Sequence, residues 1–508
     1  MIYSWFNSVV KGYLKYRYGR IQNMYMEPKT MQIDQLSMLL ENLNETHYKL
    51  MFSGSKIKNY DDFKKTIPIV EYEDIQPLIH RVMMGEDSIL WPGKTEYFAK
   101  SSGTTNDRSK YIPITDHNLF ENHITSSWDA MSILYSLLPE ARIFEGKTLL
   151  MSGSLSPFKD NPAVTVGDVS AILLSKIPMV GRPFYTPNQE IAMLSDWEDK
   201  LEKIADYCIN EDVVNFAGVP TWTIVLFNKI LEKTGKNNML EVWPNLKTYL
   251  HGGVNFEPYV RQFKALIPSD SFLYMEVYNA SEGYFSFQDK KEDKSMLLLI
   301  DNAIFYEFIP MDEFNQGIKN PIPLWEVEEE KQYCIVISTS SGLWRYMPGD
   351  TIVFTSTNPY RIRISGRTKH FINVFGEEVM VSNTDMALTQ TCEKFGVQVC
   401  EYTAAPIFLN QEGKGGHEWL VECIRSPEEK EKFALILDEN LRRINSDYDA
   451  KRQKDIALQN LKVHFVPPGT FQLWLKSKGK MGGQHKVPRL SNKRNTLEEI
   501  LQFANIGQ

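Results

Sequence analysis

The sequence contains no long run of apolar residues, which argues against two common kinds of targeting segment. A secretory signal peptide needs an unbroken apolar stretch, and a membrane-spanning helix needs about 20 apolar residues. Near the N-terminus the apolar residues instead recur at helical spacing and are interrupted by Lys11, Lys15, Arg17 and Arg20. We therefore expect an amphipathic helix that packs on its own domain and no membrane insertion. Binding of this helix to a membrane surface is the alternative.

Cysteine is scarce, and positive charge is not in excess. The five cysteines are odd in number and include no C-x-x-C spacing, so neither a disulfide framework nor a zinc site is predicted, and we expect the reducing cytoplasm. Lys and Arg number 56 against 64 Asp and Glu, a net charge of -8 that provides no global field to attract nucleic acid. No nucleic-acid partner is expected, and any anion site must be local.

No low-complexity tract interrupts the chain, whose 508 residues are too many for one ordinary hydrophobic core. Helical periodicity in segments such as 116–138 and 187–208 alternates with strand-like runs such as 147–151 and 213–216. This alternation predicts an α/β fold of layered sheets and helices. In such sheets ligands bind where strands end, so the loops that follow strands are the places to look for chemistry.

The pattern changes character near Gly366-Arg367. Downstream, helical segments near 383–395 and 427–445 accompany strand-like runs near 398–408 and 461–466. We therefore expect a large N-terminal α/β domain over residues 1–365 and a small α+β C-terminal domain over residues 366–508.

A run of hydroxyl-bearing and turn-forming residues, SSGTTNDRSK, occupies residues 101–110. Backbone N–H groups and hydroxyls donate to phosphate oxygens, and Lys110 supplies a positive charge, so the run suits an anion site. The spacing Gly-x-x-x-x-Gly-Lys-Ser/Thr of a P-loop is missing, which argues against a P-loop kinase. The alternative is a polar surface turn.

Two further motifs follow strand-like runs or turns. In Tyr278 to Gly283, a tyrosine can stack on a base, Ser281 can hydrogen-bond a phosphate, and Glu282 can hold a Mg²⁺ that bridges phosphate oxygens. Asp350, at the end of RYMPGD, presents a carboxylate that can bind both hydroxyls of a ribose. The alternatives are a strand-to-loop turn with an exposed acid and an aspartate that completes a Pro-Gly turn.

The segment 471–497 contains seven Lys or Arg residues and no acidic residue. Such a run usually indicates a solvated or nucleic-acid-binding stretch. Its glycines, Gly479, Gly482 and Gly483, would make it mobile, so that a lysine could reach a developing phosphate charge.

Taken in order, these elements resemble the adenylate-forming superfamily of acyl-CoA synthetases, luciferases and amino-acid adenylation domains. Within it, SSGTTNDRSKYIPIT, VYNASEG, SGLWRYMPGD and GGQHKVPR are most similar to the auxin-responsive acyl-acid amido synthetases, and the resemblance covers nearly the whole chain. It implies a small C-terminal domain that is mobile. It also implies that ATP and Mg²⁺ are used to join a carboxylic acid to an amine, expected to be that of an amino acid.

The resemblance also implies roles for single residues. The nucleotide-binding set would be Ser101, Ser102, Gly103, Thr104, Thr105, Lys110, Tyr278, Ser281, Asp350 and Arg367. Asp107 stands where the family often has glycine, and Asp tolerates left-handed turns better than most residues. Within the set, Tyr278 would stack on adenine and Asp350 would hold the ribose. Arg367 would contact ribose or phosphate.

Catalytic and hinge roles follow from the same resemblance. Glu282 would hold the Mg²⁺, and Lys486 would stabilise the transition state of adenylation. Lys369 would lie at the hinge between the domains, although a lysine there could also be merely solvated.

The acyl site is implied at two loops, whose members are Val219, Thr221, His251, Gly252 and Gly253. His251 invites a role as a base, but a histidine on a strand-ending loop is more often structural. The amine nucleophile needs no protein base once it is desolvated.

Three functions therefore remain in view. The first is an acid–amine ligase that forms an acyl-adenylate, and the second is a ligase that transfers the acyl group to coenzyme A as a thioester. The third is a catalytically silent nucleotide- or ligand-binding protein, against which the presence of Glu282, Asp350 and Lys486 argues. The sequence specifies neither the acid, the amine, the oligomeric state nor the pathway, because pocket shape rather than a short motif selects substrates.

Overall fold

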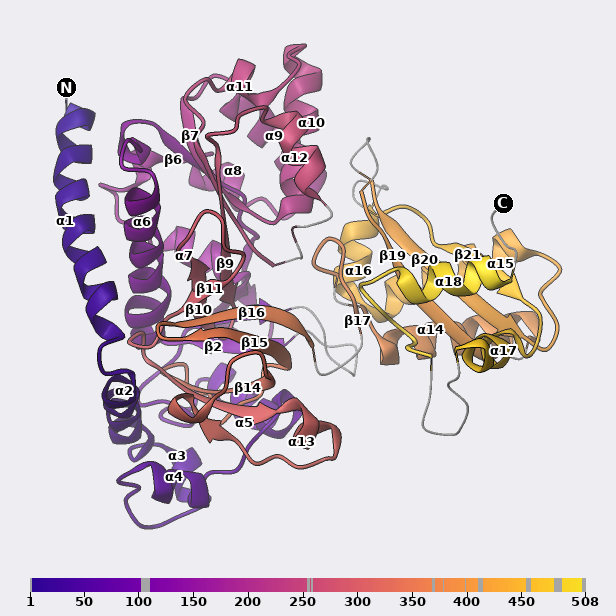
Figure 1. Ribbon diagram of the computed structural model, residues 1–508, viewed down its shortest axis with the longest axis horizontal. Coiled ribbons are helices and arrows are strands. Elements are labelled where there is room, and N and C mark those ends of the chain that lie inside the picture. Colours follow the sequence, from indigo (N-terminus) through magenta and orange to yellow (C-terminus); the bar gives the residue numbers. More distant parts are fainter. Residues whose placement is uncertain are drawn as a thin grey trace.

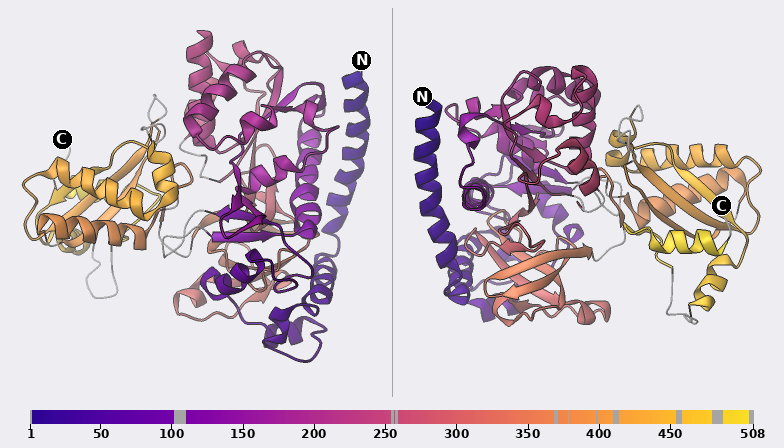
Figure 2. Two further views of the ribbon diagram at one scale, coloured as in Figure 1. Left: turned by 180° about the vertical axis from the view of Figure 1, so that it is seen from behind. Right: turned by 45° about the horizontal axis from the view of Figure 1, so that its top comes forward.

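The computed structural model describes residues 2–101, 110–253, 256, 259–367, 371–377, 379–397, 399–409, 414–453, 458–478 and 487–504. Figure 1 shows a large N-terminal part and, beside it, a smaller part formed by the elements from β17 onward. Both further views in Figure 2 keep the two parts side by side. The fold is α/β, as the alternating periodicities predict.

The largest sheet formed by the described residues has the strand order β13-β12-β14-β15-β16-β11-β10-β9-β8-β7-β3-β6. Its strands are β3 (Lys147–Leu150), β6 (Tyr185–Thr186), β7 (Val213–Gly218), β8 (Thr248–His251), β9 (Leu273–Ala280), β10 (Gly283–Gln288), β11 (Met296–Leu298), β12 (Ile304–Pro310), β13 (Ile322–Pro323), β14 (Gln332–Thr339), β15 (Asp350–Thr357) and β16 (Tyr360–Arg367). A second sheet has the order β2-β1-β5-β4, with β1 (Tyr97–Ser101), β2 (Lys110–Ile114), β4 (Leu155–Phe158) and β5 (Asn161–Gly167).

Within the large sheet, β3, β7, β8 and β9 run parallel, whereas β9, β10, β11, β16 and β15 pair antiparallel in turn. The carboxyl ends of the parallel strands therefore share one edge, where the loops after Gly218 and His251 and the end of β9 come together.

Helices cover this sheet and complete the N-terminal part. They are α1 (Ile2–Met24), α2 (Pro28–Leu43), α3 (His47–Leu50), α4 (Tyr60–Thr66), α5 (Tyr72–Met83), α6 (Thr125–Leu137), α7 (Val169–Ser175), α8 (Gln189–Ala192), α9 (Trp197–Cys208), α10 (Pro220–Thr234), α11 (Met239–Val242), α12 (Val260–Leu266) and α13 (Met311–Asn315). Shorter helical turns are the π-helical η1 (Asn118–Ile124), which leads into α6, and η2 (Ile143–Glu145), η3 (Arg182–Phe184) and η5 (Leu324–Glu326).

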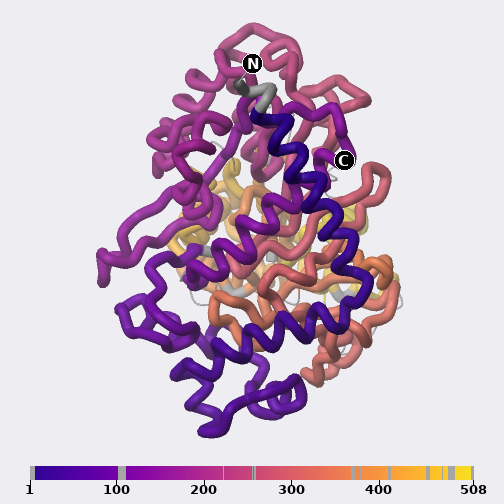
Figure 3. The backbone as a smooth tube through the Cα atoms, turned by 90° about the vertical axis from the view of Figure 1, so that its left-hand side faces the viewer, coloured from indigo at the N-terminus to yellow at the C-terminus, as the bar shows by residue number. Residues whose placement is uncertain are grey.

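The expected N-terminal amphipathic helix is confirmed as α1, and it packs on its own protein. Figure 3 shows α1 crossing the face of the N-terminal part. Its apolar residues Leu14 and Ile21 are buried in the core, and the buried Arg17 guanidinium pairs with the carboxylate of Asp129 on α6 at 2.5 Å. Among the described residues, no helix combines the length and apolar character needed to cross a bilayer.

The C-terminal elements form a sandwich around the sheet β19 (Val399–Ile407), β20 (Gly416–Cys423) and β21 (Lys462–Val466). On β20, Trp419 and Val421 face the core shared with α14 (Val381–Phe395) and α15 (Lys430–Ile444). Leu420 faces a second cluster with α17 (Thr470–Ser477) and α18 (Asn495–Phe503), as the alternation of strand side chains requires. The remaining elements are the hairpin β17 (Phe371–Ile372) and β18 (Val379–Met380) and the helix α16 (Ser446–Arg452).

Candidate active site

Asp350, which begins β15, is held in one orientation by two partners, Arg367 on the neighbouring strand β16 and Tyr278 on β9. The Tyr278 hydroxyl donates to Oδ2 of Asp350 at 2.5 Å, and Arg367 Nε donates to Oδ1 at 2.6 Å. Asp350 and Arg367 are register partners at the ends of β15 and β16, and only 7% of Asp350 is exposed. Burial, and then the neighbouring Asp350 carboxylate, raise the pKa of Tyr278 well above its ordinary value, so its hydroxyl stays a donor. The site thus offers one immobile carboxylate flanked by an aromatic ring and a guanidinium.

Glu282 lies close to this cluster, in the turn between β9 and β10. The residue is only 6% exposed, and burial raises the pKa of its carboxyl, with the ammonium of Lys110 opposing the shift. Lys110 begins β2 opposite Ser101 of β1, and its ammonium lies 5.6 Å from the centre of the Tyr72 ring. The structure therefore brings the lysine of the first motif to the glutamate of the second.

Part of the predicted phosphate loop lies outside the described residues. These residues are Ser102, Gly103, Thr104 and Thr105; the structure does describe the strand ends at Ser101 and Lys110 that flank them. Ser281 lies half-buried in the β9–β10 turn, next to Glu282. The predicted lysines Lys369 and Lys486 also fall outside the described residues.

The carboxylate of Glu282 fits a Mg²⁺ that arrives with bound phosphates rather than a Mg²⁺ held by the protein alone. Within the described part of the chain, no group of three or more His, Cys, Asp or Glu side chains is placed to hold a metal by itself. Mg²⁺ is ordinarily held by one or two carboxylates together with substrate phosphates and water. Glu282, buried beside Lys110, supplies one such carboxylate.

The two loops predicted for the acyl site lie next to each other. A Cβ built on Gly253, whose φ is +82°, would lie 3.4 Å from Cγ2 of Val219, the residue that precedes α10. A Cβ on Gly252 would lie only 2.4 Å from the carbonyl oxygen of Val277 on β9, so this position requires glycine. Thr221 follows in the first turn of α10. The predicted loops therefore do meet at the edge of the parallel strands.

His251 is packed rather than poised for proton transfer. Its ring stacks on Phe256 with centroids 3.9 Å apart, and only 3% of the residue is exposed. Burial lowers its pKa to about 3, so the imidazole is neutral at physiological pH and a poor base. The structural interpretation of this residue is favoured over the catalytic one.

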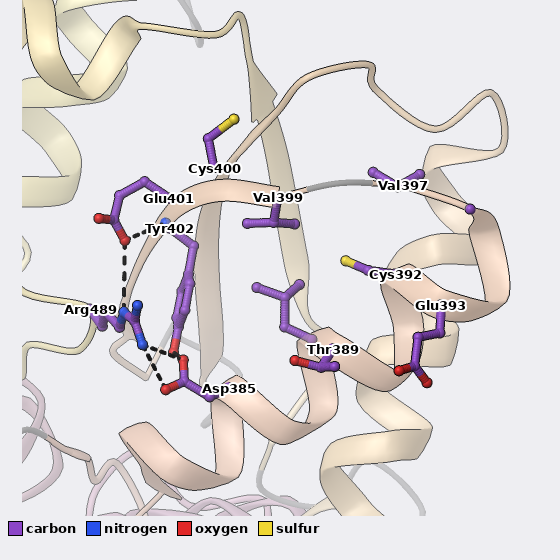
Figure 4. Close-up of a pocket in the computed structure, with 12 residues that line it drawn as sticks. Asp385, Thr389, Cys392, Glu393, Val397, Val399, Cys400, Glu401, Tyr402 and Arg489 are labelled. Atoms are coloured by element: carbon purple, nitrogen blue, oxygen red, sulfur yellow. Dashed lines mark hydrogen bonds and ion pairs between the residues drawn. The ribbon is translucent and has the colours of Figure 1, made fainter.

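Sequence reasoning assigned no role to Arg489, three residues after Lys486. Its guanidinium contacts Asp385 on α14 at 2.7 Å and Glu401 on β19 at 3.7 Å, beside a cavity of about 730 Å³ (Figure 4). The segment 487–492, called the strap below, also adds backbone hydrogen bonds to β19, between Ala404 N and Arg489 O at 2.8 Å and between Ser491 N and Ala404 O at 3.1 Å. The position of Arg489 within GGQHKVPR is the sequence signal for a role of this residue.

Sequence reasoning also missed a group of polar side chains on η1 and β9, which includes the buried Asn118 and His123 and the half-buried Asn279, whose Oδ1 is buried. The signal was present in NLFENHITSSWDA, where polar residues recur at helical spacing. Such a pattern ordinarily indicates a solvent-facing stripe.

Comparison with known proteins gives matches along nearly the whole chain. The GH3 family N-terminal domain matches residues 17–186 and 152–272, the GH3 family central domain residues 297–367, and the GH3 family C-terminal domain residues 382–495. Indole-3-acetic acid-amido synthetase GH3.3 of Arabidopsis thaliana is 23% identical, over 92% of this chain and 90% of its own length. Jasmonoyl-L-amino acid synthetase JAR4 of Nicotiana attenuata is 21% identical, over 90% of each chain.

Solved structures share the fold at lower identity. The GH3.15 acyl acid amido synthetase superposes with a TM-score of 0.61 at 18% identity, over 96% of both chains. A 2-hydroxyisobutyryl-CoA ligase superposes with a TM-score of 0.57 at 14% identity, over 94% of this chain and 92% of that one. Because the three domain models cover most of its length, the chain belongs to the GH3 family.

Proposed function

We propose that this chain is an ATP-dependent acid–amine ligase, which activates a carboxylic acid as an acyl-adenylate and transfers the acyl group to the amine of an amino acid. The observation that carries the proposal is the fixed carboxylate of Asp350 beside Tyr278, Glu282 and Lys110, in a member of the GH3 family. An aromatic ring, a carboxylate for ribose, a metal-binding carboxylate and a lysine are the groups that hold Mg·ATP.

In the first half-reaction, a carboxylate oxygen of the acid attacks the α-phosphorus of ATP and pyrophosphate leaves. Asp350 would hold the ribose, Tyr278 would stack on adenine, and Arg367 would contact ribose or phosphate. Ser281 and the loop of Ser101 to Lys110 would hold phosphates. Mg²⁺ on Glu282 would neutralise phosphate charge, and the ammonium of Lys486 would offset charge that develops between the acid oxygen and the α-phosphorus.

In the second half-reaction, the amine nitrogen attacks the carbonyl carbon, AMP leaves with the electron pair of the broken C–O bond, and the nitrogen loses a proton. Val219, Thr221, Gly252 and Gly253 would border the acyl group. We propose that residues 1–365 form the adenylation domain and residues 366–508 a mobile domain, with Lys369 at the hinge, that serves the two half-reactions in different orientations. A cytoplasmic location is part of the proposal; it is supported by the five cysteines, all free thiols.

A coenzyme A ligase is the second candidate, because the 2-hydroxyisobutyryl-CoA ligase shares the fold. The two functions have the same first half-reaction and differ only in the acceptor. The acceptor must therefore be measured separately from adenylation.

The test is acid-dependent exchange of labelled pyrophosphate into ATP across a panel of carboxylic acids. We expect Lys486→Ala and Glu282→Gln each to lower exchange on the order of 10²- to 10³-fold. Lys430→Ala and Glu292→Gln make the same chemical changes at exposed positions and should leave exchange intact. Mass spectrometry with added amino acids or coenzyme A then identifies an amide or a thioester. ATP binding without exchange for any acid would contradict the proposal and favour a silent binding protein.

A further inference from the structure

The helix that follows β2 buries a row of polar side chains where a core helix ordinarily presents apolar ones. Asn118, Asn122, His123 and Ser126 are each 0% exposed, and Asp129 one turn further on is 5% exposed. They lie on η1 and on the first turns of α6, which η1 leads into. Polar groups buried in a core must be hydrogen-bonded to be tolerated, so the partners of each side chain decide what the row is for.

Part of the row has structural partners. Asn122 donates to the carbonyl of Asn302 at 2.9 Å and accepts from the backbone N–H of Tyr284 at 2.7 Å, which ties η1 to the start of β10. Asp129 is paired with Arg17 of α1 at 2.5 Å. These residues hold helices and strands together and are not available to a ligand.

The other part of the row has no such partners. Among the described residues, neither amide atom of Asn118 nor the hydroxyl of Ser340 has a hydrogen-bond partner. The ring nitrogens of His123 and Oδ1 of Asn279 make no hydrogen bond of good geometry, apart from a side-chain contact between these two residues. His123 and Asn279 are close neighbours: burial lowers the pKa of His123 to about 4, and a side-chain hydrogen-bonding contact with Asn279 opposes that shift. Asn118 lies near Ser340, because both contact the hydroxyl of Thr115. This hydroxyl accepts from the Asn118 N–H at 3.0 Å and donates to the Ser340 carbonyl at 2.6 Å.

This unpartnered group lies next to the proposed nucleotide site. Asn279 follows Tyr278 on β9, and successive side chains of a strand point to opposite faces of the sheet. Tyr278 therefore faces Asp350, while Asn279 faces η1. β9 ends at the turn that contains Ser281 and Glu282. At this end of the strand, a nucleotide on the Tyr278 face and an acid on the Asn279 face can come together.

We propose that the acid activated by this enzyme carries an uncharged hydrogen-bonding group, a hydroxyl or a carbonyl, besides its carboxylate, and that His123, Asn118 and Asn279 bind this group. The inference rests on the proposed function, because it identifies the substrate class of that same site. At neutral pH, His123 offers one donor and one acceptor, and each amide offers both, which complements a hydroxyl or carbonyl. The charged member of the row, Asp129, is neutralised by Arg17 of α1, so a second carboxylate or an ammonium is not matched.

An acid that lacks the group would leave buried donors and acceptors unpaired. Sites built to hydrogen-bond a substrate reject analogues without the group far more strongly than apolar pockets reject an added hydroxyl. The expected preference for the substituted acid is therefore at least tenfold in kcat/KM.

The experiment measures acid-dependent pyrophosphate exchange with matched acid pairs: benzoate with 4-hydroxybenzoate, cyclohexanecarboxylate with its 4-hydroxy derivative, and hexanoate with 5-oxohexanoate. The full-length enzyme should prefer the substituted member of at least one pair by tenfold or more. His123→Leu should reduce that ratio at least tenfold while retaining exchange with the unsubstituted acid, and His123→Gln should keep most of it. His80→Leu makes the same chemical change at an exposed position of α5 and should not alter the ratio.

Asn279→Val supplies a second variant on a different element, in case His123→Leu does not fold; it should lower the same ratio. Exchange without preference for any substituted acid, or a ratio that neither variant changes, would overturn the inference while leaving adenylation established. Absence of exchange for every acid, with ATP still bound, would instead count against the proposed function itself.

Discussion

Asp350 is the residue whose geometry most restricts what the site can bind. Tyr278 and Arg367 occupy one oxygen each, so the carboxylate cannot turn away from a ligand. We predict that the native enzyme prefers ATP to 2′-deoxy-ATP and 3′-deoxy-ATP. Asp350→Asn should raise the KM for ATP about tenfold and remove this preference, because an amide cannot accept from both ribose hydroxyls. Pyrophosphate exchange with the three nucleotides measures this.

Asp289→Asn is the matched control for that variant. Asp289 is also paired with an arginine of β16, Arg361 at 2.6 Å, but none of the proposed nucleotide contacts includes it. The Asp289→Asn variant should change the stability of the protein without changing its discrimination between nucleotides. If Asp350→Asn still prefers ATP over both deoxy-nucleotides, Asp350 does not hold the ribose.

Glu276, on β9 two residues before Tyr278, gives a pH-dependent prediction. Burial raises its pKa from 4.5 to about 7, with Lys294 opposing the shift. A raised carboxyl pKa means that the folded state keeps a proton that the unfolded state loses, so the contribution to stability is complete below the ordinary pKa and is lost as pH rises through about 7. The loss amounts to at most about 3 kcal/mol.

We therefore predict that Glu276→Gln stabilises the protein relative to the native chain at pH 8 and has much less effect at pH 4.5. The thermal unfolding midpoint at the two pH values measures this. Glu292→Gln, at an exposed position, should show no such difference. An equal effect of Glu276→Gln at both pH values would show that Glu276 ionises normally in the folded protein.

Sequence motifs identified the candidate site residues whose side-chain type and local pattern alone indicate a role. Lys110, Tyr278, Glu282 and Asp350 were named from local patterns and Arg367 from the family resemblance, and the structure brings them together. His123 and Asn118 were missed, because polar residues at helical spacing normally indicate exposure to solvent. Only the packing of η1 against β10 shows that this stripe is buried.

At the scale of elements, periodicity predicted helices and strands well where one period continued without a break. The segment 187–208 was read as one helix, but it forms α8 and α9, separated where Asp196 caps the second helix by accepting from Asp199 N at 2.8 Å. The capping residue was visible in the sequence, whereas the pairing of β11 with β16 was not, since no local pattern records which distant strands become neighbours.

The strap, residues 487–492, directly follows Lys486 and is bonded to the rest of the C-terminal part. Arg489 binds Asp385, whose Oδ1 also accepts from the Tyr402 hydroxyl at 2.7 Å (Figure 4). Asn492 Oδ1 accepts from the Asn373 N–H at 2.9 Å, next to β17. If Lys486 acts as proposed, the strap that follows it directly in the chain would orient it, so we predict that Arg489→Ala lowers the kcat of pyrophosphate exchange about 10- to 100-fold with little change in the KM for ATP.

The decisive readout is a double-mutant cycle. In a Lys486→Ala background, Arg489→Ala should cause no further loss of exchange, since its effect passes through the lysine. Glu393→Gln, which lines the same cavity, is the matched control and should retain native exchange. Additive losses would show that Arg489 supports the fold of the C-terminal part rather than the position of Lys486.

For the whole molecule, the contacts between the two parts determine which face of the C-terminal part meets the active site. Lys451 of α16 places its ammonium 5.6 Å from the Trp197 ring and 5.3 Å from the Trp222 ring, and these two rings stack at 4.5 Å. Phe375, in the β17–β18 hairpin, contacts Trp222 at 5.7 Å. Figure 1 shows β17 turned toward the N-terminal part, with α17, which precedes the segment of Lys486, farther away. Under the proposed mechanism Lys486 serves adenylation, so we predict that this orientation, with α17 away from the N-terminal part, serves the transfer half-reaction.

We predict that Lys451→Ala slows transfer from a supplied acyl-adenylate to the amine and leaves pyrophosphate exchange equal or faster. The two cation–π contacts contribute about 1 kcal/mol in total, which corresponds to a roughly fivefold change in the transfer rate. Single-turnover amide formation and pyrophosphate exchange on the same preparation measure the two half-reactions, with Lys430→Ala as the exposed control. A loss of folding would lower both rates together, whereas a fall in exchange alone would mean that the Lys451 contact belongs to the adenylation orientation. Slower transfer without a fall in exchange is therefore the result that ties this contact to the transfer step.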